Sequence, residues 1–139
     1  MKRTLRYPLA VIVGWAVAIG LVAVIEGLGH ILYPPPENLL LDNIEQMNTY
    51  IQSAPFAALL FVILAWYIGC YVGGLAACVI AKRASMLMAA FVGVLIYAGA
   101  LTSLMVISHP TWFSVAALIG IPIITAFAGK HGKRFETKT

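Results

Sequence analysis

Apolar residues form four runs along the chain, at residues 8–32, 55–81, 84–107 and 110–128. A helix needs about 20 mostly apolar residues to cross the hydrocarbon core of a membrane, and each run has about that length or more. The runs are apolar on every side, which is typical of helices surrounded by lipid or by other helices. The pattern predicts an all-α membrane protein, a four-transmembrane-helix bundle that forms a single domain over residues 1–139.

Prolines mark several boundaries of these runs. Pro8 is expected at the first helical position, where the N–H that proline lacks would have no partner. Pro34–Pro36 imposes an extended chain and ends the first helix. Pro55, preceded by Ser53 as the capping residue, is expected to open the second helix, and Pro110 the fourth.

The charged residues between the runs are segregated by sign. All nine Lys and Arg residues lie near one of the two chain ends or between the second and third runs, whereas the loop 33–54 holds acidic residues and no basic one. Basic residues favour the cytoplasmic side of a membrane protein. Both termini and the tail 129–139, with a solvated His131, are therefore predicted to be cytoplasmic, and the loop 33–54 is predicted to face outward.

The composition supports a membrane location and argues against a nucleic-acid-binding role. Hydrophobic residues make up 62% of the chain and charged residues 10%, against roughly 45–50% and 25% in soluble domains. The net charge of +4 comes from short basic clusters beside the apolar runs and gives no basic face for a nucleic acid. The lipid bilayer is the expected partner.

The outer loop contains the pattern of a short helix. Its segment Asp42-Asn43-Ile44-Glu45 matches a capping box, in which the first residue caps the helix. Apolar residues recur around it at helical spacing, at Leu40, Ile44, Met47 and Ile51. We predict a short amphipathic helix on the outer membrane surface, and the alternative is a structured connector without that role.

Small residues recur four positions apart within three of the runs. Such rows let helix backbones approach closely in lipid, where burial gives no hydrophobic gain. The rows are Ala16 and Gly20 in the first run, Gly69, Gly73 and Ala77 in the second, and Ala89 and Gly93 in the third. They predict close helix packing, either within one chain or between neighbouring chains.

Polar side chains at membrane depth fall into two layers when they are counted from the outer ends of the helices. His30, Ser108, His109 and Ser114 lie near the outer boundary, and Glu26, Thr102 and Ser103 lie deeper. The inner halves of the helices hold almost no polar side chain, so we expect a polar cup that opens outward. This asymmetry argues against a channel or transporter made of one chain, whereas an oligomeric pore stays an alternative.

Glu26 is the main candidate for chemistry, because a carboxylate within the membrane is costly and is expected to face a partner. With His30 and His109 it supplies the ligand types of a two-histidine, one-carboxylate site for a divalent metal such as zinc or iron. The alternative is structural: Glu26 pairs with His30 or hydrogen-bonds another helix to fix helix register. The candidate partners for that bond are Thr102, Ser103, Trp66 and Tyr97.

Several segments resemble a family of small bacterial four-helix integral membrane proteins for which no activity is established. They are Glu26–Pro36, with the sequence EGLGHILYPPP, the pairs Ala65-Trp66 and Gly73-Gly74, and His109–Phe113, with the sequence HPTWF. The resemblance implies a four-helix fold in the bacterial inner membrane. It implies no catalytic residue, and it places the recognisable segments around the outer polar layer.

These patterns favour a non-enzymatic membrane protein that forms a homo-oligomer or joins a larger membrane complex. The outer loop and the polar cup would be its interaction surface. A rival hypothesis from another class is a membrane-embedded metal or redox protein that uses Glu26, His30 and His109, and a third is an oligomeric channel. The sequence does not identify a cofactor, and the divalent metal of the rival hypothesis is the candidate.

Overall fold

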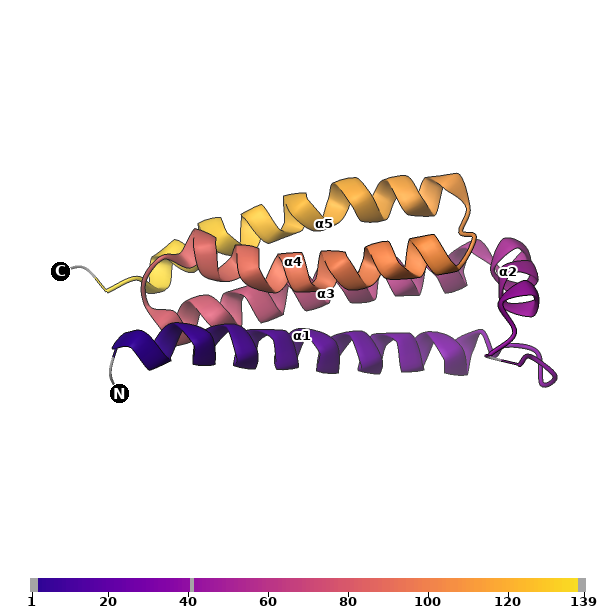
Figure 1. Ribbon diagram of the computed structural model, residues 1–139, viewed down its shortest axis with the longest axis horizontal. Coiled ribbons are helices and arrows are strands. Elements are labelled where there is room, and N and C mark those ends of the chain that lie inside the picture. Colours follow the sequence, from indigo (N-terminus) through magenta and orange to yellow (C-terminus); the bar gives the residue numbers. More distant parts are fainter. Residues whose placement is uncertain (1–2, 41, 138–139) are drawn as a thin grey trace.

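The computed structural model describes residues 3–40 and 42–137, most of which are helical, with no β-strand among them. Four long helices lie side by side and a short helix lies across one end of them (Figure 1). The order along the chain is α1 (Arg3–Leu32), α2 (Ile44–Ser53), α3 (Phe56–Ala81), α4 (Ser85–Val106), α5 (Thr111–Gly132) and the 3-10 helix η1 (Lys133–Phe135). The four long helices are long and apolar enough to cross a membrane, which supports a multi-pass helical membrane protein.

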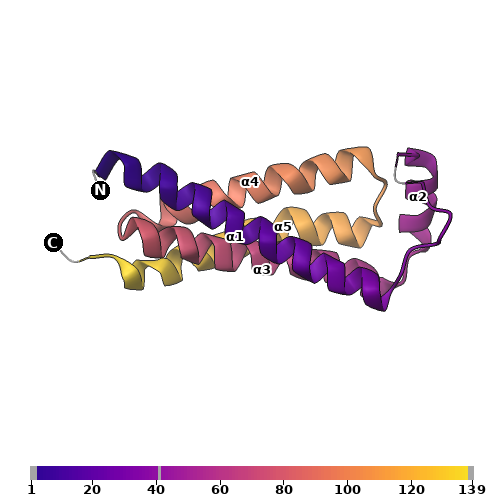
Figure 2. The ribbon, with the colours of Figure 1, turned by 90° about the horizontal axis from the view of Figure 1, so that it is seen from below.

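The two ends of the molecule differ, and we name them the loop end and the basic end. The loop end carries α2 and the α4–α5 turn at residues 107–110, and the basic end carries residues 3–6, the α3–α4 turn at 82–84 and residues 130–137 (Figure 1, Figure 2). All described Lys and Arg residues lie at the basic end. The basic residues that are clustered in three parts of the sequence therefore lie together at one end of the molecule.

Two helices extend beyond their predicted bounds. The first begins at Arg3, so Pro8 lies inside α1 instead of opening it. Near a helix start a proline removes a single backbone hydrogen bond, which the following turns tolerate. The last helix continues to Gly132, beyond the predicted end at residue 128, and η1 follows it. Part of the predicted tail is therefore helical.

The helix in the long loop is capped one residue later than the sequence pattern predicts. Asn43 is the capping residue of α2, and its side-chain oxygen accepts a hydrogen bond from the Gln46 N–H at 3.1 Å. The Gln46 side chain in turn accepts from the Leu40 N–H at 3.0 Å. Asp42 and Asn43 are both good capping residues, so the adjacent pair made the predicted register ambiguous.

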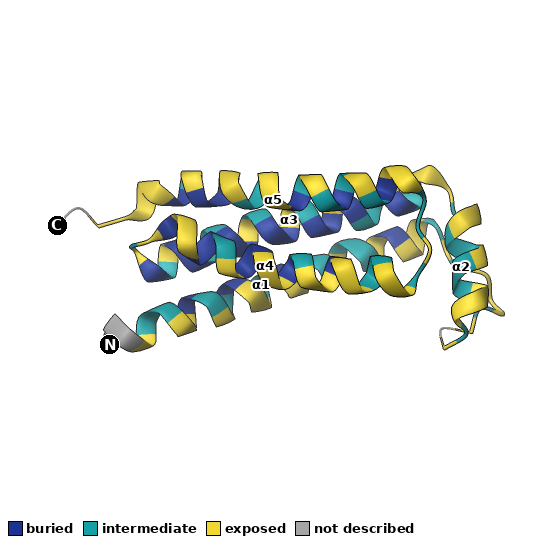
Figure 3. Ribbon diagram, turned by 45° about the horizontal axis from the view of Figure 1, so that its top comes forward, coloured by how far each residue is buried: buried dark blue, intermediate teal, exposed yellow. Residues whose placement is uncertain are grey.

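The central helix is α3, which contacts α1, α4 and α5. In its most apolar stretch 39% of the residues are buried, compared with 17% in α1. Figure 3 shows buried positions where the long helices face one another and exposed positions on their outer sides. The helix α1 is therefore the least enclosed of the four long helices.

The contact between α1 and α3 is made by backbone and very small side chains. A Cβ atom added to Gly73 would lie 2.5 Å from the carbonyl oxygen of Gly14, and one added to Gly14 would lie 2.6 Å from that of Gly73. In the same row of α3, Gly69 faces Ala18 and Ala77 faces Gly14. The predicted row Gly69, Gly73 and Ala77 thus packs within the chain.

The small residues predicted for α1 are not the ones that make this contact. Ala16 and Gly20 are exposed, and a Cβ added to Gly20 would meet no atom within 4 Å. Small residues occur on two faces of α1, and spacing alone does not tell which face turns to α3. Of the row predicted in α4, Gly93 packs against Thr125 of α5.

Many exposed residues of the long helices are large and apolar, and Figure 3 shows exposed positions along the outer sides of these helices. Val24, Val94 and Ile119 are 61%, 64% and 59% exposed. Soluble monomers rarely expose contiguous apolar patches of more than a few hundred Å². An apolar coat on all the long helices is what lipid contact favours.

Hydrogen bonds fasten the last described residues to the α3–α4 turn at the basic end. The Glu136 carboxylate accepts from the Ser85 N–H at 2.8 Å, at the start of α4. This bond stabilises the ionised form and holds the pKa of Glu136 below its usual value. The N–H and the hydroxyl of Thr137 both donate to the Lys82 carbonyl, at 3.0 and 3.2 Å.

The structure corrects the prediction that His131 is simply solvated. Its Nδ1 is hydrogen-bonded to the Tyr71 hydroxyl at 2.6 Å, and the two rings meet edge to face. The α5 helix extends far enough to bring His131 against α3, which the predicted helix end at residue 128 did not allow.

The close α1–α3 contact predicts that a larger side chain at this contact destabilises the fold. Replacing Gly73 by Ile places side-chain atoms where the Gly14 carbonyl lies, so we expect a loss of about 1–3 kcal/mol or more in the free energy of unfolding. The matched control is Gly99→Ile, because a Cβ at Gly99 meets nothing within 4 Å. Unfolding of both variants in mixed micelles by added denaturing detergent measures the difference, and equal losses would contradict the described packing.

Candidate interaction site at the loop end

The loop end brings together the elements that carry the predicted polar residues. The last turns of α1 and α4, the 107–110 turn and the first turn of α5 meet there, and α2 lies across them (Figure 2). The helix α2 has no fully buried residue, but Ile51 packs against the core of the long helices.

Two side chains of α2 fasten this helix to the α4–α5 turn. The side-chain oxygen of Asn48 accepts from the Ser108 N–H at 2.8 Å, and the side-chain N–H of Gln52 donates to the Ser108 carbonyl at 2.8 Å. Residues four apart lie on one helical face, so Asn48 and Gln52 reach the same residue together. Both backbone groups of Ser108 are thereby satisfied by α2.

A hollow of about 590 Å³ lies between α2 and the chain before it. Its walls include the polar side chains Asn38, Glu45, Gln46 and Thr49. The Asn43 and Gln46 hydrogen bonds fix the chain on either side of it. This hollow lies in the loop that is expected to form an interaction surface.

Glu26 has a partner in α3. The indole N–H of Trp66 donates to its Oε1 at 3.2 Å, and Trp66 is 8% exposed. Trp66 is one of the four hydrogen-bond partners that were predicted for a structural role of Glu26. Tyr97 instead lines a groove between α4 and α5, and Thr102 bonds within its own helix.

Glu26 and His30 share the wall of a small cavity of about 40 Å³. Tyr33 and Tyr50 line the same cavity, so it joins the end of α1 to α2. Its size leaves room for few atoms, since a single water molecule needs roughly 10–15 Å³. His30 itself is exposed.

His109 is held by contacts that do not involve Glu26. Its ring stacks on Phe113 with the ring centres 4.5 Å apart and the planes 14° apart. Its Nδ1 lies 2.8 Å from the Ile107 carbonyl, and a carbonyl only accepts, so Nδ1 carries the proton. Burial lowers the pKa of His109 and so favours the neutral form of the imidazole.

The three ligands of the predicted metal centre are not gathered into one group. Among residues 3–40 and 42–137, no cluster of three or more His, Cys, Asp or Glu side chains could hold a metal ion. Glu26 and His30 are neighbours, whereas His109 is bound to Ile107 and Phe113. The metal centre stays a hypothesis of the sequence without support from these contacts.

The residues of the predicted polar cup are placed at the loop end, but their contacts are local. The Thr102 hydroxyl is exposed and donates to the Ala98 carbonyl of its own helix at 2.9 Å. The Ser103 carbonyl accepts from Ile107, and the Ser114 N–H donates to Pro110. Ser108 contacts α2 through its backbone. None of these hydrogen bonds reaches Glu26.

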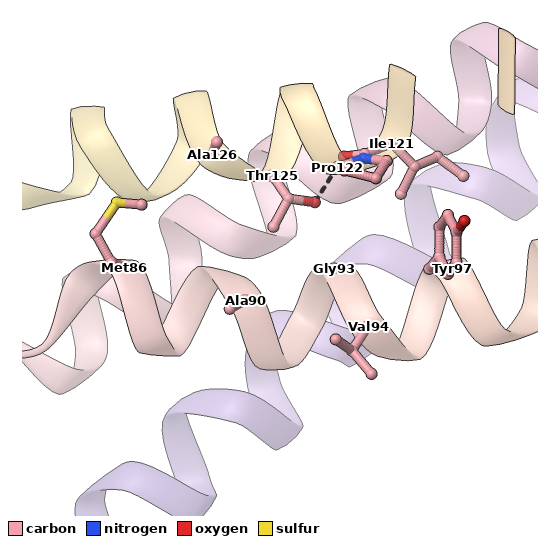
Figure 4. Close-up of a pocket in the computed structure, with 9 residues that line it drawn as sticks. All are labelled: Met86, Ala90, Gly93, Val94, Tyr97, Ile121, Pro122, Thr125 and Ala126. Carbon is pink, nitrogen blue, oxygen red and sulfur yellow. Dashed lines mark hydrogen bonds between the residues drawn. The ribbon is translucent and has the colours of Figure 1, made fainter. Parts of the chain in front are cut away.

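The α4–α5 groove is apolar (Figure 4). It has a volume of about 320 Å³, and its lining includes the predicted packing residue Gly93. Tyr97 and Thr125 supply its hydroxyl groups, and that of Thr125 donates to the Ile121 carbonyl at 2.8 Å, as the dashed line shows. The groove therefore offers little polar chemistry.

The sequence analysis missed Asn48 and Gln52, the residues that position α2. A signal for them exists, because two amide side chains four apart on an otherwise mixed helix form one polar face. Their target, the backbone of Ser108, could not be found from spacing, since the two segments are distant in the sequence.

Comparisons with family models, curated proteins and solved structures find no match to the chain.

The Glu26–Trp66 bond gives a test of the structural interpretation. Trp66→Phe keeps a buried aromatic ring but removes the donor to Glu26, so we expect a loss of about 1–3 kcal/mol in the free energy of unfolding. Trp112→Phe is the matched control, because Trp112 is 36% exposed. Detergent unfolding of both variants measures the difference. A Trp66→Phe cost no larger than that of the control would show that the bond contributes nothing.

Proposed function

We propose that the chain is a multi-pass membrane protein with a binding role, which associates with further copies of itself through α1. In this proposal the four long helices cross a membrane as a four-helix bundle, with both chain ends in the cytoplasm. The loop end then faces outward, with α2 on the membrane surface, and serves as the interaction surface for partners.

The orientation is supported by the distribution of charge. The described Lys and Arg residues gather at the basic end, and the loop that holds Glu37, Asp42 and Glu45 lies at the other end. Basic segments stay preferentially on the cytoplasmic side during membrane insertion. An even number of crossings places residues 3–6 and 130–137 on that same side.

Self-association is supported most directly by the outward face of α1. Ala16, Gly20, Ala23 and Gly27 follow one another at intervals of four, three and four residues, which is one helical face. The first three are exposed, and a Cβ added to Gly20 or Gly27 would meet nothing within 4 Å. Glycine within a helix costs about 1 kcal/mol relative to alanine, so an open glycine on a lipid-facing side has no benefit within a single chain.

The inward face of the same helix shows what such a row does. Gly14 and Ala18 let α1 approach α3 until backbone atoms touch. In lipid, helices associate through this kind of close packing, because hydrocarbon chains are as apolar as leucine. A second copy of α1 is the partner that offers the same row of small residues, and it would cover the least buried helix of the chain.

A binding role is supported by how the polar groups of the loop end are used. The Glu26 carboxylate, the Asn48 and Gln52 amides and the Nδ1 of His109 all make hydrogen bonds that join or shape elements. The Asn48 and Gln52 bonds fasten α2 to the α4–α5 turn, and the polar hollow beside α2 stays open. Rigid presentation of a recess is what recognition of a partner requires.

The α1 interface gives the test of self-association. Gly20→Leu places a large side chain on the outward face without any clash inside the chain, so we expect the oligomer to dissociate into monomers. Gly99→Leu is the matched control, since Gly99 is also exposed and open but lies on α4. Size-exclusion chromatography with light scattering, on protein in a mild detergent, measures the mass of each variant.

Three outcomes can be distinguished. An oligomeric wild type with a monomeric Gly20→Leu variant and an oligomeric control supports the proposal. A monomeric wild type contradicts self-association. An oligomer that Gly99→Leu disrupts and Gly20→Leu does not would move the interface from α1 to α4 and contradict the proposed face.

A further inference from the structure

A cavity of about 130 Å³ lies at the basic end, between three segments that are distant in the sequence. Its lining consists of Arg6 and Tyr7 from the start of α1, Ala81 and Arg83 around the end of α3, and Thr137 after η1. The volume is several times the roughly 10–15 Å³ that one water molecule needs. A ligand group of a few heavy atoms therefore fits.

The donors in this cavity suit an oxyanion. A guanidinium carries five N–H donors in a planar fork that matches the oxygen atoms of phosphate. The described hydrogen bond of Arg6 uses its Nε–H, which donates to the Ile80 carbonyl at 2.6 Å, so the terminal nitrogens keep the other four donors. Arg83 brings a second guanidinium to the lining, and Tyr7 brings a phenolic hydroxyl. We propose that this cavity binds a phosphate group.

Three hydrogen-bond acceptors close to the cavity already receive hydrogen bonds from other residues of the chain. The Ile80 carbonyl accepts from Arg6, and the Lys82 carbonyl accepts twice from Thr137. The carboxylate of Glu136 accepts from the Ser85 N–H and is not part of the lining. The carbonyl end of α3, which would otherwise repel an anion, is thus partly neutralised by bonds within the chain.

The walls of the cavity are fixed relative to one another. Thr137 is bonded to the α3–α4 turn through Lys82, Glu136 is bonded to the start of α4, and Arg6 ties α1 to the end of α3. Each bond joins residues that are more than fifty positions apart in the chain. The segments that line the cavity are therefore fastened together before any ligand arrives, which reduces the entropy lost on binding.

Two sources can supply the phosphate group. The cavity lies at the end of the long helices, where a phospholipid headgroup would be found if these helices cross a membrane, and anionic lipids attract basic residues there. Inorganic phosphate or a soluble phosphate ester offers the same oxygen atoms from the aqueous side. The lipid source rests on the proposed membrane orientation, whereas the phosphate chemistry of the cavity does not.

The experiment measures the melting temperature of the full chain in micelles of a nonionic detergent that contains no phosphate. One arm adds phosphatidylglycerol, and the other adds inorganic phosphate at constant ionic strength. A ligand that binds the folded state raises the melting temperature, and we expect a rise of roughly several degrees in at least one arm. Arg83→Gln should abolish the rise, and the matched control Arg134→Gln, which removes one charge from η1 outside the cavity lining, should keep it.

The arms separate the two sources. A rise with the lipid alone assigns the cavity to a headgroup, and a rise with inorganic phosphate assigns it to a soluble phosphate. The proposal is overturned if neither ligand raises the melting temperature. It is also overturned if Arg83→Gln and Arg134→Gln reduce the rise equally, which would indicate diffuse attraction by the basic end.

If Arg83→Gln does not fold, Tyr7→Phe replaces it: a smaller rise supports the cavity and an unchanged rise overturns it. Oligomer mass is not read in this experiment, so the proposed self-association stands or fails separately.

Discussion

The structure depends on the backbone contact between α1 and α3. In lipid, two helices gain little by hiding apolar side chains from hydrocarbon, so they must gain by packing closely. Gly14 and Gly73 allow that approach, and the carbonyl oxygen of each lies where the Cβ of the other would be. The helix α3 also contacts α4 and α5, which places it at the centre of the long helices. Glu26 lies on α1 and Trp66 lies on α3, so the position of α1 against α3 sets where these two side chains meet. The same contact sets where Arg6 meets the end of α3. The Glu26–Trp66 bond and the bond of Arg6 to α3 thus both depend on one close contact between small residues.

The four long helices could be predicted from the sequence, because length and hydropathy alone determine whether a segment can cross a membrane. Their register could not. The row Gly69, Gly73 and Ala77 was identified, but the row predicted on α1, Ala16 and Gly20, is not the one that meets it, since Gly14 and Ala18 make that contact. Both α1 faces carry small residues, and the choice between them depends on side chains of α3 that are far away in the sequence. The outward face that remains is the basis of the proposed self-association.

The candidate site shows the same division. Local features were accessible, such as a helix in the long loop and the need of Glu26 for a partner. The capping residue was misplaced by one position because Asp42 and Asn43 are equally suitable. The contacts that give the loop end its shape were not accessible, since Asn48 and Gln52 bond a backbone turn about sixty residues away. His131 likewise meets Tyr71 across two helices. Spacing rules describe one helix at a time, and these contacts depend on how several helices are placed together.

The central claim is that the molecule is polarised, with the loop end outside and the basic end in the cytoplasm. Labelling of single introduced cysteines with a membrane-impermeant maleimide in intact cells tests it most directly. Glu45→Cys and Lys133→Cys suit this measurement because both positions are exposed, one at each end. The native Cys70 and Cys78 are buried, so the unmodified chain serves as the blank. The account predicts labelling at position 45 in intact cells and at position 133 only after permeabilisation. Labelling at position 133 in intact cells, with position 45 protected, would contradict it.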